Sequence, residues 1–181
     1  MKKFIKVSFI LSFFFIVTHY TYAAELEHFT GVKENPQSCV YTGKVKINGI
    51  SAVDNEDELG VFALDNSGNE FLVGSCVLGQ VLDGYYYVNV YGDDPTSDIK
   101  DGAADQETLF LKVWDKSENK EYSIGDNVEY EVFTGLTEPS IPPKWSNAIS
   151  FGLLNVEAKN LKTYGLIDVI NLLKVLSNVP N

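Results

Sequence analysis

The stretch Gly84-Tyr-Tyr-Tyr-Val-Asn-Val-Tyr91, then Gly92-Asp93-Asp94, and further on Thr108-Leu-Phe-Leu-Lys-Val-Trp114, decides the fold. Side chains alternate between the two faces of a β-strand, so each outer segment divides into an apolar face and an aromatic or polar face. The stretch therefore predicts two half-buried strands on either side of an aspartate-rich loop. The expected core faces consist of Tyr86, Val88, Val90, Leu109, Leu111 and Val113.

Further strands follow from the same alternation along the rest of the chain. Asn48-Gly49 is typical of a tight hairpin turn, and residues 65–69 favour a hairpin between the segments that flank them. Because no helical pattern separates these segments, they predict an all-β fold, an antiparallel β-sandwich that is Ig-like or jelly-roll-like. The additional strands are expected at residues 39–47, 59–64, 71–77, 120–122, 128–132 and 148–156.

The two ends of the chain have patterns of their own. Lysines in the first six residues, an apolar run over 7–17 and Ala23-Ala24 predict a bacterial secretory signal peptide that is cleaved after Ala23. The alternative is a transmembrane anchor, which is disfavoured because the apolar core is short and the uncharged run contains His19. Near the C-terminus, helical spacing predicts a short amphipathic helix. Its apolar face consists of Leu166, Val169, Ile170, Leu173 and Leu176.

These patterns predict a signal peptide over residues 1–23, a β-sandwich domain over 24–158 and a C-terminal amphipathic helix over 159–181. We expect the protein to be secreted or held at the cell surface, with the periplasm as the alternative location. Once the leader is removed, we expect no membrane insertion.

The charge of the chain restricts its partners. It has 25 acidic residues against 14 Lys and Arg, a net charge of −11, and the leader removes lysines but no acidic residue. Phosphate backbones and anionic lipid headgroups repel such a chain, so nucleic acid is not an expected partner. The expected partner is an extracellular protein or a polysaccharide.

Two cysteines, Cys39 and Cys76, predict a disulfide, because an even number of cysteines in an exported chain favours pairing. The alternative is a nucleophilic thiol, which needs a basic partner. After cleavage of the leader, the one remaining histidine is His28. A nucleophilic role is therefore disfavoured.

Catalytic signatures are scarce. The sequence has no Gly-x-Ser-x-Gly elbow, P-loop or dinucleotide fingerprint. After leader cleavage, one histidine and two cysteines remain, which are too few ligands for a zinc site. A glycoside hydrolase needs only two carboxylates, which any acidic chain can offer. We therefore predict that the protein is not an enzyme and that it has no certain cofactor.

The aspartate-rich loop is a candidate calcium site. Calcium takes six to eight oxygen ligands, and carboxylates on a loop with flexible glycines can supply several of them. The alternative is a solvated acidic connector, because the spacing matches no established calcium loop. The candidate ligands are Asp93, Asp94, Asp98, Asp101 and Asp105.

The outer faces of the two strands form a candidate carbohydrate site. Sugar rings stack on aromatic side chains, and neighbouring amides bond the hydroxyls. The six side chains share one surface if the two strands pair; the alternative is that they are covered by other parts of the sandwich. The candidate ligand-binding residues are Tyr85, Tyr87, Asn89, Tyr91, Phe110 and Trp114.

Several short motifs resemble a module found in secreted, multi-domain proteins of environmental bacteria, in which the module often precedes a dockerin-like tail. The resemblance covers roughly residues 30–156 and implies a β-sandwich in an extracellular setting. The motifs are residues 45–49 (Val-Lys-Ile-Asn-Gly), 57–62 (Asp-Glu-Leu-Gly-Val-Phe), 73–76 (Val-Gly-Ser-Cys), 90–95 (Val-Tyr-Gly-Asp-Asp-Pro), 101–102 (Asp-Gly) and 110–115 (Phe-Leu-Lys-Val-Trp-Asp).

The tail is similar to the end of a dockerin calcium loop and its following helix at Gly165-Leu-Ile-Asp168-Val-Ile. With Asp168 at the twelfth loop position, Glu157, Lys159 and Leu161 stand where the first, third and fifth ligands belong. Because Lys159 and Leu161 cannot coordinate a cation, the tail is expected to be a degenerate remnant that packs on the sandwich.

Taken together, the sequence predicts a secreted, non-enzymatic binding or structural module of a bacterial extracellular or cell-surface system. The first alternative is a carbohydrate-binding module that uses the exposed aromatic face. The second is a carboxylate-based glycoside hydrolase.

Overall fold

The computed structural model describes residues 24–125, 128–132, 137–147 and 150–159. Within these ranges the chain forms β-strands and no helix, so the predicted all-β class is confirmed there. The strands are β1 (Ser38–Gly43), β2 (Val45–Ile47), β3 (Ile50–Ser51), β4 (Glu58–Leu64), β5 (Glu70–Val77), β6 (Tyr86–Tyr91), β7 (Phe110–Asp115), β8 (Lys120–Ser123), β9 (Val128–Glu131) and β10 (Ser150–Ala158).

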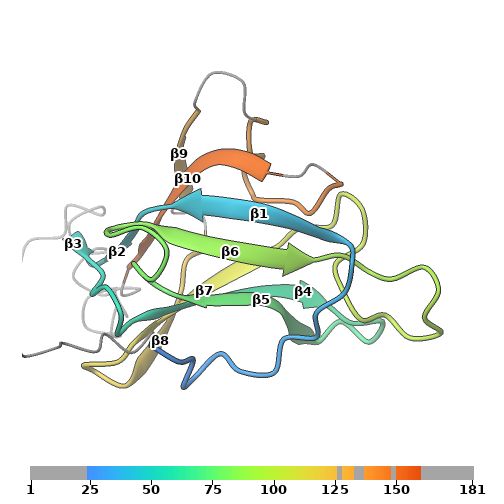
Figure 1. Ribbon diagram of the computed structural model, residues 1–181, viewed down its shortest axis with the longest axis horizontal. Helices are drawn as coiled ribbons and strands as arrows, with labels where there is room; N and C mark the ends of the chain where they lie inside the picture. The colour runs from blue at the N-terminus through green and yellow to red at the C-terminus, as the bar shows by residue number, and fades with distance from the viewer. Residues whose placement is uncertain (1–23, 126–127, 133–136, 148–149, 160–181) are drawn as a thin grey trace, which may run out of the picture.

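The strands form two sheets that pack face to face as a β-sandwich. Sheet A has the order β3-β2-β10-β1-β6, with β9 paired to β10, and sheet B has the order β5-β4-β7-β8. Figure 1 shows β1 and β6 of sheet A above β4 and β5 of sheet B. Most neighbouring strands are antiparallel, as expected, but β10 runs parallel to both β1 and β2.

The predicted strand at 39–47 is divided into β1 and β2 at Lys44. The side chain of Asn155 accepts a hydrogen bond from the Lys44 backbone N–H at 2.9 Å, and the Lys44 carbonyl accepts one from Val156 N–H at 2.8 Å. Both halves therefore stay attached to the same neighbour, β10. After β2, the Asn48-Gly49 turn has positive φ at both residues, as the sequence predicted.

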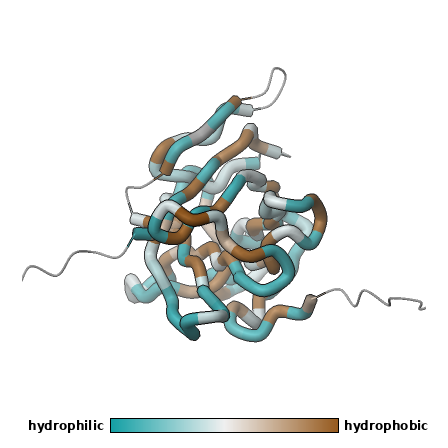
Figure 2. The backbone as a smooth tube through the Cα atoms, turned by 90° about the vertical axis from the view of Figure 1, so that its left-hand side faces the viewer, coloured by the Kyte–Doolittle hydropathy of each residue, from teal (hydrophilic) through white to brown (hydrophobic). Residues whose placement is uncertain are grey.

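The core lies between the sheets and follows the predicted alternation. On β6, Tyr86, Val88 and Val90 are buried, while Tyr87 and Asn89 are exposed. Figure 2 shows hydrophobic and hydrophilic segments alternating along the strands. The second predicted core face, Leu109, Leu111 and Val113, is buried as well.

The loop between β6 and β7 crosses from sheet A to sheet B and is pinned by Trp145. The indole is buried and donates a hydrogen bond from Nε1 to the Val90 carbonyl at 3.0 Å. The Trp145 backbone bonds both Gln106 (2.9 Å) and Glu107 (3.0 Å) on the far side of the loop. One residue thus fixes both ends of the crossing segment, the first through its side chain and the second through its backbone.

The segment before β1 covers the outer face of sheet B. Backbone N–H groups of Glu27, His28 and Phe29 donate to the carboxylate of Glu58, at 2.5, 3.1 and 2.8 Å for the shortest contact of each. Phe29 is buried and packs edge-on against the Phe62 ring. We call residues 27–29 the N-terminal strap.

Two of the predictions concern the ends of the chain. The signal peptide and nearly all of the C-terminal helix lie outside the described residues.

Cys39 on β1 and Cys76 on β5 are free, so the predicted disulfide is not formed in the structure, and the pairing stays a prediction. Burial raises the pKa of the Cys39 thiol to about 11 and that of Cys76 to about 12, so both thiols are protonated at neutral pH.

Candidate functional site

Three outward side chains of β6, Tyr87, Asn89 and Tyr91, form a row that we call the tyrosine stripe. Tyr87 is 45% exposed, Asn89 is exposed and Tyr91 is half-buried. The stripe is open because its neighbours on β1 are smaller: Thr42 pairs with Tyr87, Val40 with Asn89 and Ser38 with Tyr91. A short side chain beside a tyrosine leaves one face of its ring accessible.

Tyr91, at the far end of the stripe, is held in place by polar neighbours. Burial raises the pKa of its phenol, and the nearby carboxylate of Glu34 raises it further, while the Asn89 side chain acts in the opposite direction. The phenol therefore stays protonated over the whole neutral range and keeps its hydrogen-bond donor.

Tyr85 lies at the other end of the stripe, just before β6 begins. Its ring is half-buried, and the ammonium of Lys44 lies 4.8 Å from the ring centroid. A cation over an aromatic face is attracted by the ring quadrupole. This contact places a positive charge where the row of aromatic side chains ends.

Phe110 and Trp114 do not join this surface, because β6 and β7 belong to different sheets. Phe110 is 37% exposed on the outer face of sheet B. Trp114 is buried beneath the strap, with the ring of His28 stacked on it at a centroid distance of 5.2 Å and an interplanar angle of 8°. The structure therefore brings together Tyr85, Tyr87, Asn89 and Tyr91, and separates the other two candidates from them.

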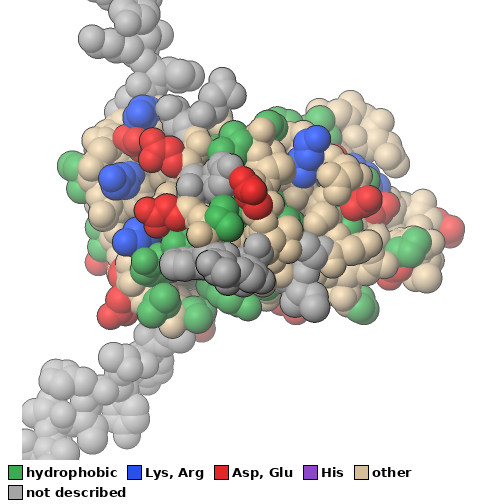
Figure 3. Space-filling view, turned by 90° about the horizontal axis from the view of Figure 1, so that it is seen from above, with side chains coloured by type: hydrophobic (Ala, Val, Ile, Leu, Met, Phe, Trp, Pro, Cys, Tyr) green, Lys and Arg blue, Asp and Glu red, His purple; other side chains and the backbone are tan. Residues whose placement is uncertain are grey.

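A groove lies on the outer face of sheet A over β2, β9 and β10, and β1 separates it from the tyrosine stripe on β6. Its volume is about 590 Å³, and charged side chains of both signs line it. Figure 3, which views this side of the molecule, shows blue and red side chains close together at the left. The polar and charged lining residues are Lys44, Lys46, Ser51, Glu129, Glu131, Asn155, Glu157 and Lys159.

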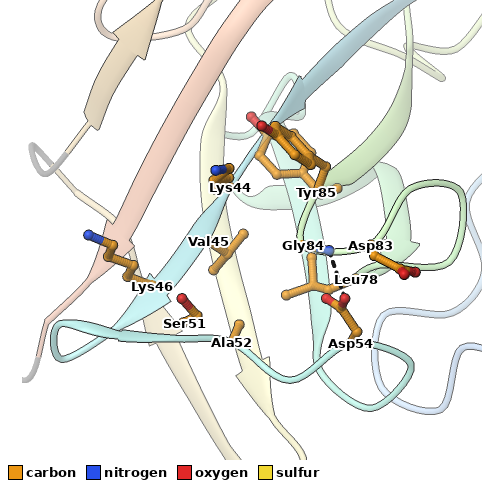
Figure 4. Close-up of a pocket in the computed structure, with 11 residues that line it drawn as sticks. Lys44, Val45, Lys46, Ser51, Ala52, Asp54, Leu78, Asp83, Gly84 and Tyr85 are labelled. Atoms are coloured by element: carbon orange, nitrogen blue, oxygen red, sulfur yellow. Dashed lines mark hydrogen bonds between the residues drawn. The ribbon is translucent and has the colours of Figure 1, made fainter.

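A second hollow, of about 180 Å³, opens at the end of the sandwich near β2. It shares Lys44, Lys46 and Ser51 with the groove, so the two hollows adjoin. Figure 4 shows Lys44 and Tyr85 on one side of it and Asp54 and Asp83 on the other. Sequence reasoning missed this hollow, although Lys44 and Lys46 at alternate positions of one predicted strand were a signal for a positive outer face.

The aspartates of the 93–105 loop mostly bond the loop itself. The Asp93 carboxylate accepts the Asp101 backbone N–H at 2.9 Å, and Asp101 accepts that of Asp94 at 3.0 Å. The second Asp101 oxygen pairs with Lys33 at 2.6 Å. Across the described residues, no three Asp, Glu, His or Cys side chains converge as a metal site. The calcium site stays a prediction, and the two further candidate ligands, Asp98 and Asp105, are exposed.

Glu107 anchors the end of this loop on sheet B. Its carboxylate accepts hydrogen bonds from the backbone N–H groups of Leu64 (3.1 Å) and Ala104 (2.7 Å) and pairs with Lys100 at 2.7 Å. Burial on its own raises the pKa of this carboxyl, but Lys100 and the two N–H groups together hold the pKa below its ordinary value.

This lowered pKa predicts a loss of stability in acid. A carboxylate whose folded pKa lies below its unfolded value stabilises the fold above the unfolded value, near pH 4.5, and this contribution is lost as the pH falls through the folded pKa. In denaturant titrations, we expect the free energy of unfolding to fall less steeply below pH 4.5 for Glu107→Gln than for the wild type. The control is Asp105→Asn, which removes an exposed carboxylate two residues away. An equal fall in the free energy of unfolding with pH for the wild type and Glu107→Gln would contradict the prediction.

Comparison with known proteins gives no family for this chain. No family model matches its sequence, and no curated protein matches it. Among solved structures, an alternative pilotin from the type II secretion system of Vibrio cholerae is similar at a TM-score of 0.32 and 8% identity, covering 68% of this chain and 99% of the pilotin. A similarity this low supports no functional assignment. In the described ranges, no helix has the length and apolar composition needed to cross a membrane.

Proposed function

We propose that the protein is a non-enzymatic binding module that acts outside the cytoplasm and holds a polysaccharide on the outer face of sheet A. The observation that carries the proposal is the open ring of Tyr87, on a sheet face beside the amide of Asn89. The apolar face of a sugar ring packs on such an aromatic ring, and the amide offers both a donor and an acceptor to the hydroxyls.

The dimensions of the surface support an extended ligand. Residues two apart on a strand lie roughly 6.6–6.8 Å apart, so Tyr87 and Tyr91 are separated by about 13 Å along β6. This spacing suits a ligand of several sugar rings. On the other side of β1, the groove adds lysine, glutamate and amide groups that can bond hydroxyls of a ligand lying across the sheet. The basic and apolar leader at residues 1–17 supports the location outside the cytoplasm.

Replacing Tyr87 by alanine tests the proposal. We expect the fraction of protein retained by an insoluble polysaccharide to fall, with a loss of affinity on the order of tenfold, as for an aromatic anchor at the centre of an interface. The measurement is a depletion isotherm on a panel of insoluble polysaccharides, with far-UV circular dichroism to confirm folding.

The matched control is Phe110→Ala, which removes a ring of similar exposure from sheet B. Retention should be unchanged in this variant. Equal losses in both variants would show non-specific hydrophobic adsorption and refute the proposed face. Release of reducing sugar by the wild type during the same incubation would identify a hydrolase instead.

A further inference from the structure

The hollow at the end of the sandwich is closed at its base, and Tyr85, which precedes the tyrosine stripe in the sequence, lines it. Its floor consists of core side chains, Val45, Leu78 and Tyr86, all of them buried. Tyr85 and Lys44 form one side of its rim, as Figure 4 shows. A chain lying along Tyr91 and Tyr87 that continued past Tyr85 would meet this floor and could go no further.

The volume of the hollow fits one ring. At about 180 Å³ it is smaller than the roughly 300–1,000 Å³ of sites that enclose a drug-sized molecule. A single sugar ring matches this size, with its apolar face toward Val45 and Leu78 and its hydroxyls toward the polar rim. The hollow is therefore suited to a terminal residue rather than to the middle of a chain.

The two lysines at the rim lack the ion pairs that most other lysines within the described ranges make. Lys33, Lys100, Lys112, Lys116 and Lys159 each pair with a carboxylate. Among the described residues, neither Lys44 nor Lys46 has a carboxylate within ion-pair distance. Both side chains are exposed on the same face of the sheet, two residues apart. An anionic group on the ligand would supply the missing partner.

The two aspartates on the opposite side have different roles. Asp54 accepts the Gly84 backbone N–H at 2.7 Å and packs against Gly79, so it holds the loop that closes the hollow. Asp83 is exposed at the rim. Its carboxylate repels an anion in the hollow, and salt weakens this repulsion because Asp83 is exposed to solvent. Lys44 is the charged group that lies against the aromatic wall.

We infer that this hollow binds the anionic terminal sugar of a polysaccharide that is otherwise uncharged, with the anionic group held by the ammonium of Lys44 and the ring packed beside Tyr85. A polysaccharide charged along its whole length would be repelled by the net charge of −11. The inference rests on the proposed function, and it makes the protein a module that recognises chain ends. Lys46, further along β2 in Figure 4, lies opposite Glu157 of β10, so Lys44 is the main cation for the ligand. A carboxylate on a uronic acid and a sulfate ester both have the required charge.

The test uses monosaccharides, which fill the hollow without reaching Tyr87. Glucuronate, glucose 6-sulfate and glucose are titrated into the isotopically labelled protein, and the amide resonances of Val45, Ala52 and Tyr85 are followed. We expect saturable shifts with an anionic sugar and none with glucose at the same concentration. Stronger binding of glucuronate identifies a uronic acid as the natural end group, and stronger binding of the sulfate identifies a sulfated sugar.

Charge variants locate the anion. Lys44→Gln should weaken binding of the preferred anion by at least about tenfold, the scale of a lost hydrogen bond between charged groups, and Lys46→Gln should weaken it less. Asp83→Asn should strengthen it. Lys144→Gln, which removes a lysine outside both hollows, should have no effect. Equal binding of glucose, no saturable shift, or an unchanged affinity in Lys44→Gln would overturn the inference.

Tyr87→Ala separates this inference from the proposed function. The variant should bind the anionic monosaccharide normally while losing retention on the polysaccharide. If no polysaccharide retains the wild type but the monosaccharide pattern holds, the binding face is wrong and the hollow remains a site for an anionic sugar. If retention on the polysaccharide depends on Tyr87 but the lysine variants bind the anionic sugar like the wild type, the proposed face of sheet A is supported. The hollow is then not the site for the terminal sugar.

Discussion

Glu58→Ala is expected to release the N-terminal strap from sheet B and to lower the free energy of unfolding by about 3 kcal/mol or more, because each hydrogen bond to a charged group contributes roughly 1.5–3 kcal/mol and several are lost together. Glu58 is 1% exposed, and its two oxygens accept the backbone N–H groups of three consecutive residues. Without the carboxylate these donors lose their partner, and Phe29 loses the contact that keeps it over Gly60 and Phe62.

Two measurements distinguish local release from global destabilisation. Hydrogen exchange at residues 27–31 should become fast in Glu58→Ala under conditions where the amides of β4 and β7 stay protected. The control is Glu56→Ala, an exposed acidic residue two positions earlier, which should leave both the strap and the unfolding free energy unchanged. Protection of the strap that persists in Glu58→Ala would show that Phe29 packing is sufficient without the carboxylate.

The local features of this fold could be predicted because they depend on neighbouring residues. Alternation along 86–91 correctly assigned the buried and exposed faces of β6, and Asn48-Gly49 correctly indicated the turn after β2. Both signals arise within a few residues and reflect backbone and side-chain geometry that holds in any sheet. The same is true of the hairpin that joins β4 and β5, where Asp65 bonds its own loop.

The pairing of strands that are far apart in the sequence could not be predicted from the alternation of their side chains. Nothing in the alternation of 84–114 indicates that its two strands enter different sheets, so the grouping of Phe110 and Trp114 with the tyrosines failed. Glu58 also ends an acidic run that begins at Asp54, and one more acidic residue in such a run gives no sign of a partner about 30 residues away in the sequence. The parallel position of β10 beside β1 and β2 similarly joins segments more than 100 residues apart.

The candidate site was predictable in part for the same reason. The stripe on β6 follows from one strand, and its residues were identified in the sequence. The hollow at the end of the sandwich combines β2, the 52–54 segment and the loop before β6, so it exists only after the sheets have packed. Lys44 acquires its role from Tyr85, which lies 41 positions away and comes within 4.8 Å only in the fold.

Trp145→Ala is expected to cost about 3–5 kcal/mol in the free energy of unfolding, as for other buried aromatic residues truncated to alanine. The indole is 3% exposed and satisfies the Val90 carbonyl, which would lose its bond. Because the ring also supports Gly92 at the start of the crossing loop, we expect faster hydrogen exchange from Gly92 to Glu107 than elsewhere. Trp145→Phe, which keeps most of the volume but no N–H, should cost less.

A double-mutant cycle with Gly92 tests the packing directly. A Cβ built on Gly92 lies 2.1 Å from Cζ2 of Trp145, so Gly92→Ala alone should destabilise the protein by overlap with the ring. In a Trp145→Ala background the ring is absent, and Gly92→Ala should cost far less, which gives a strong coupling energy. The contrasting variant is Gly102→Ala, whose Cβ would meet the Gly92 backbone oxygen at 2.1 Å and should destabilise both backgrounds equally. Additive effects for Gly92 and Trp145 would mean that the indole does not set the position of the loop.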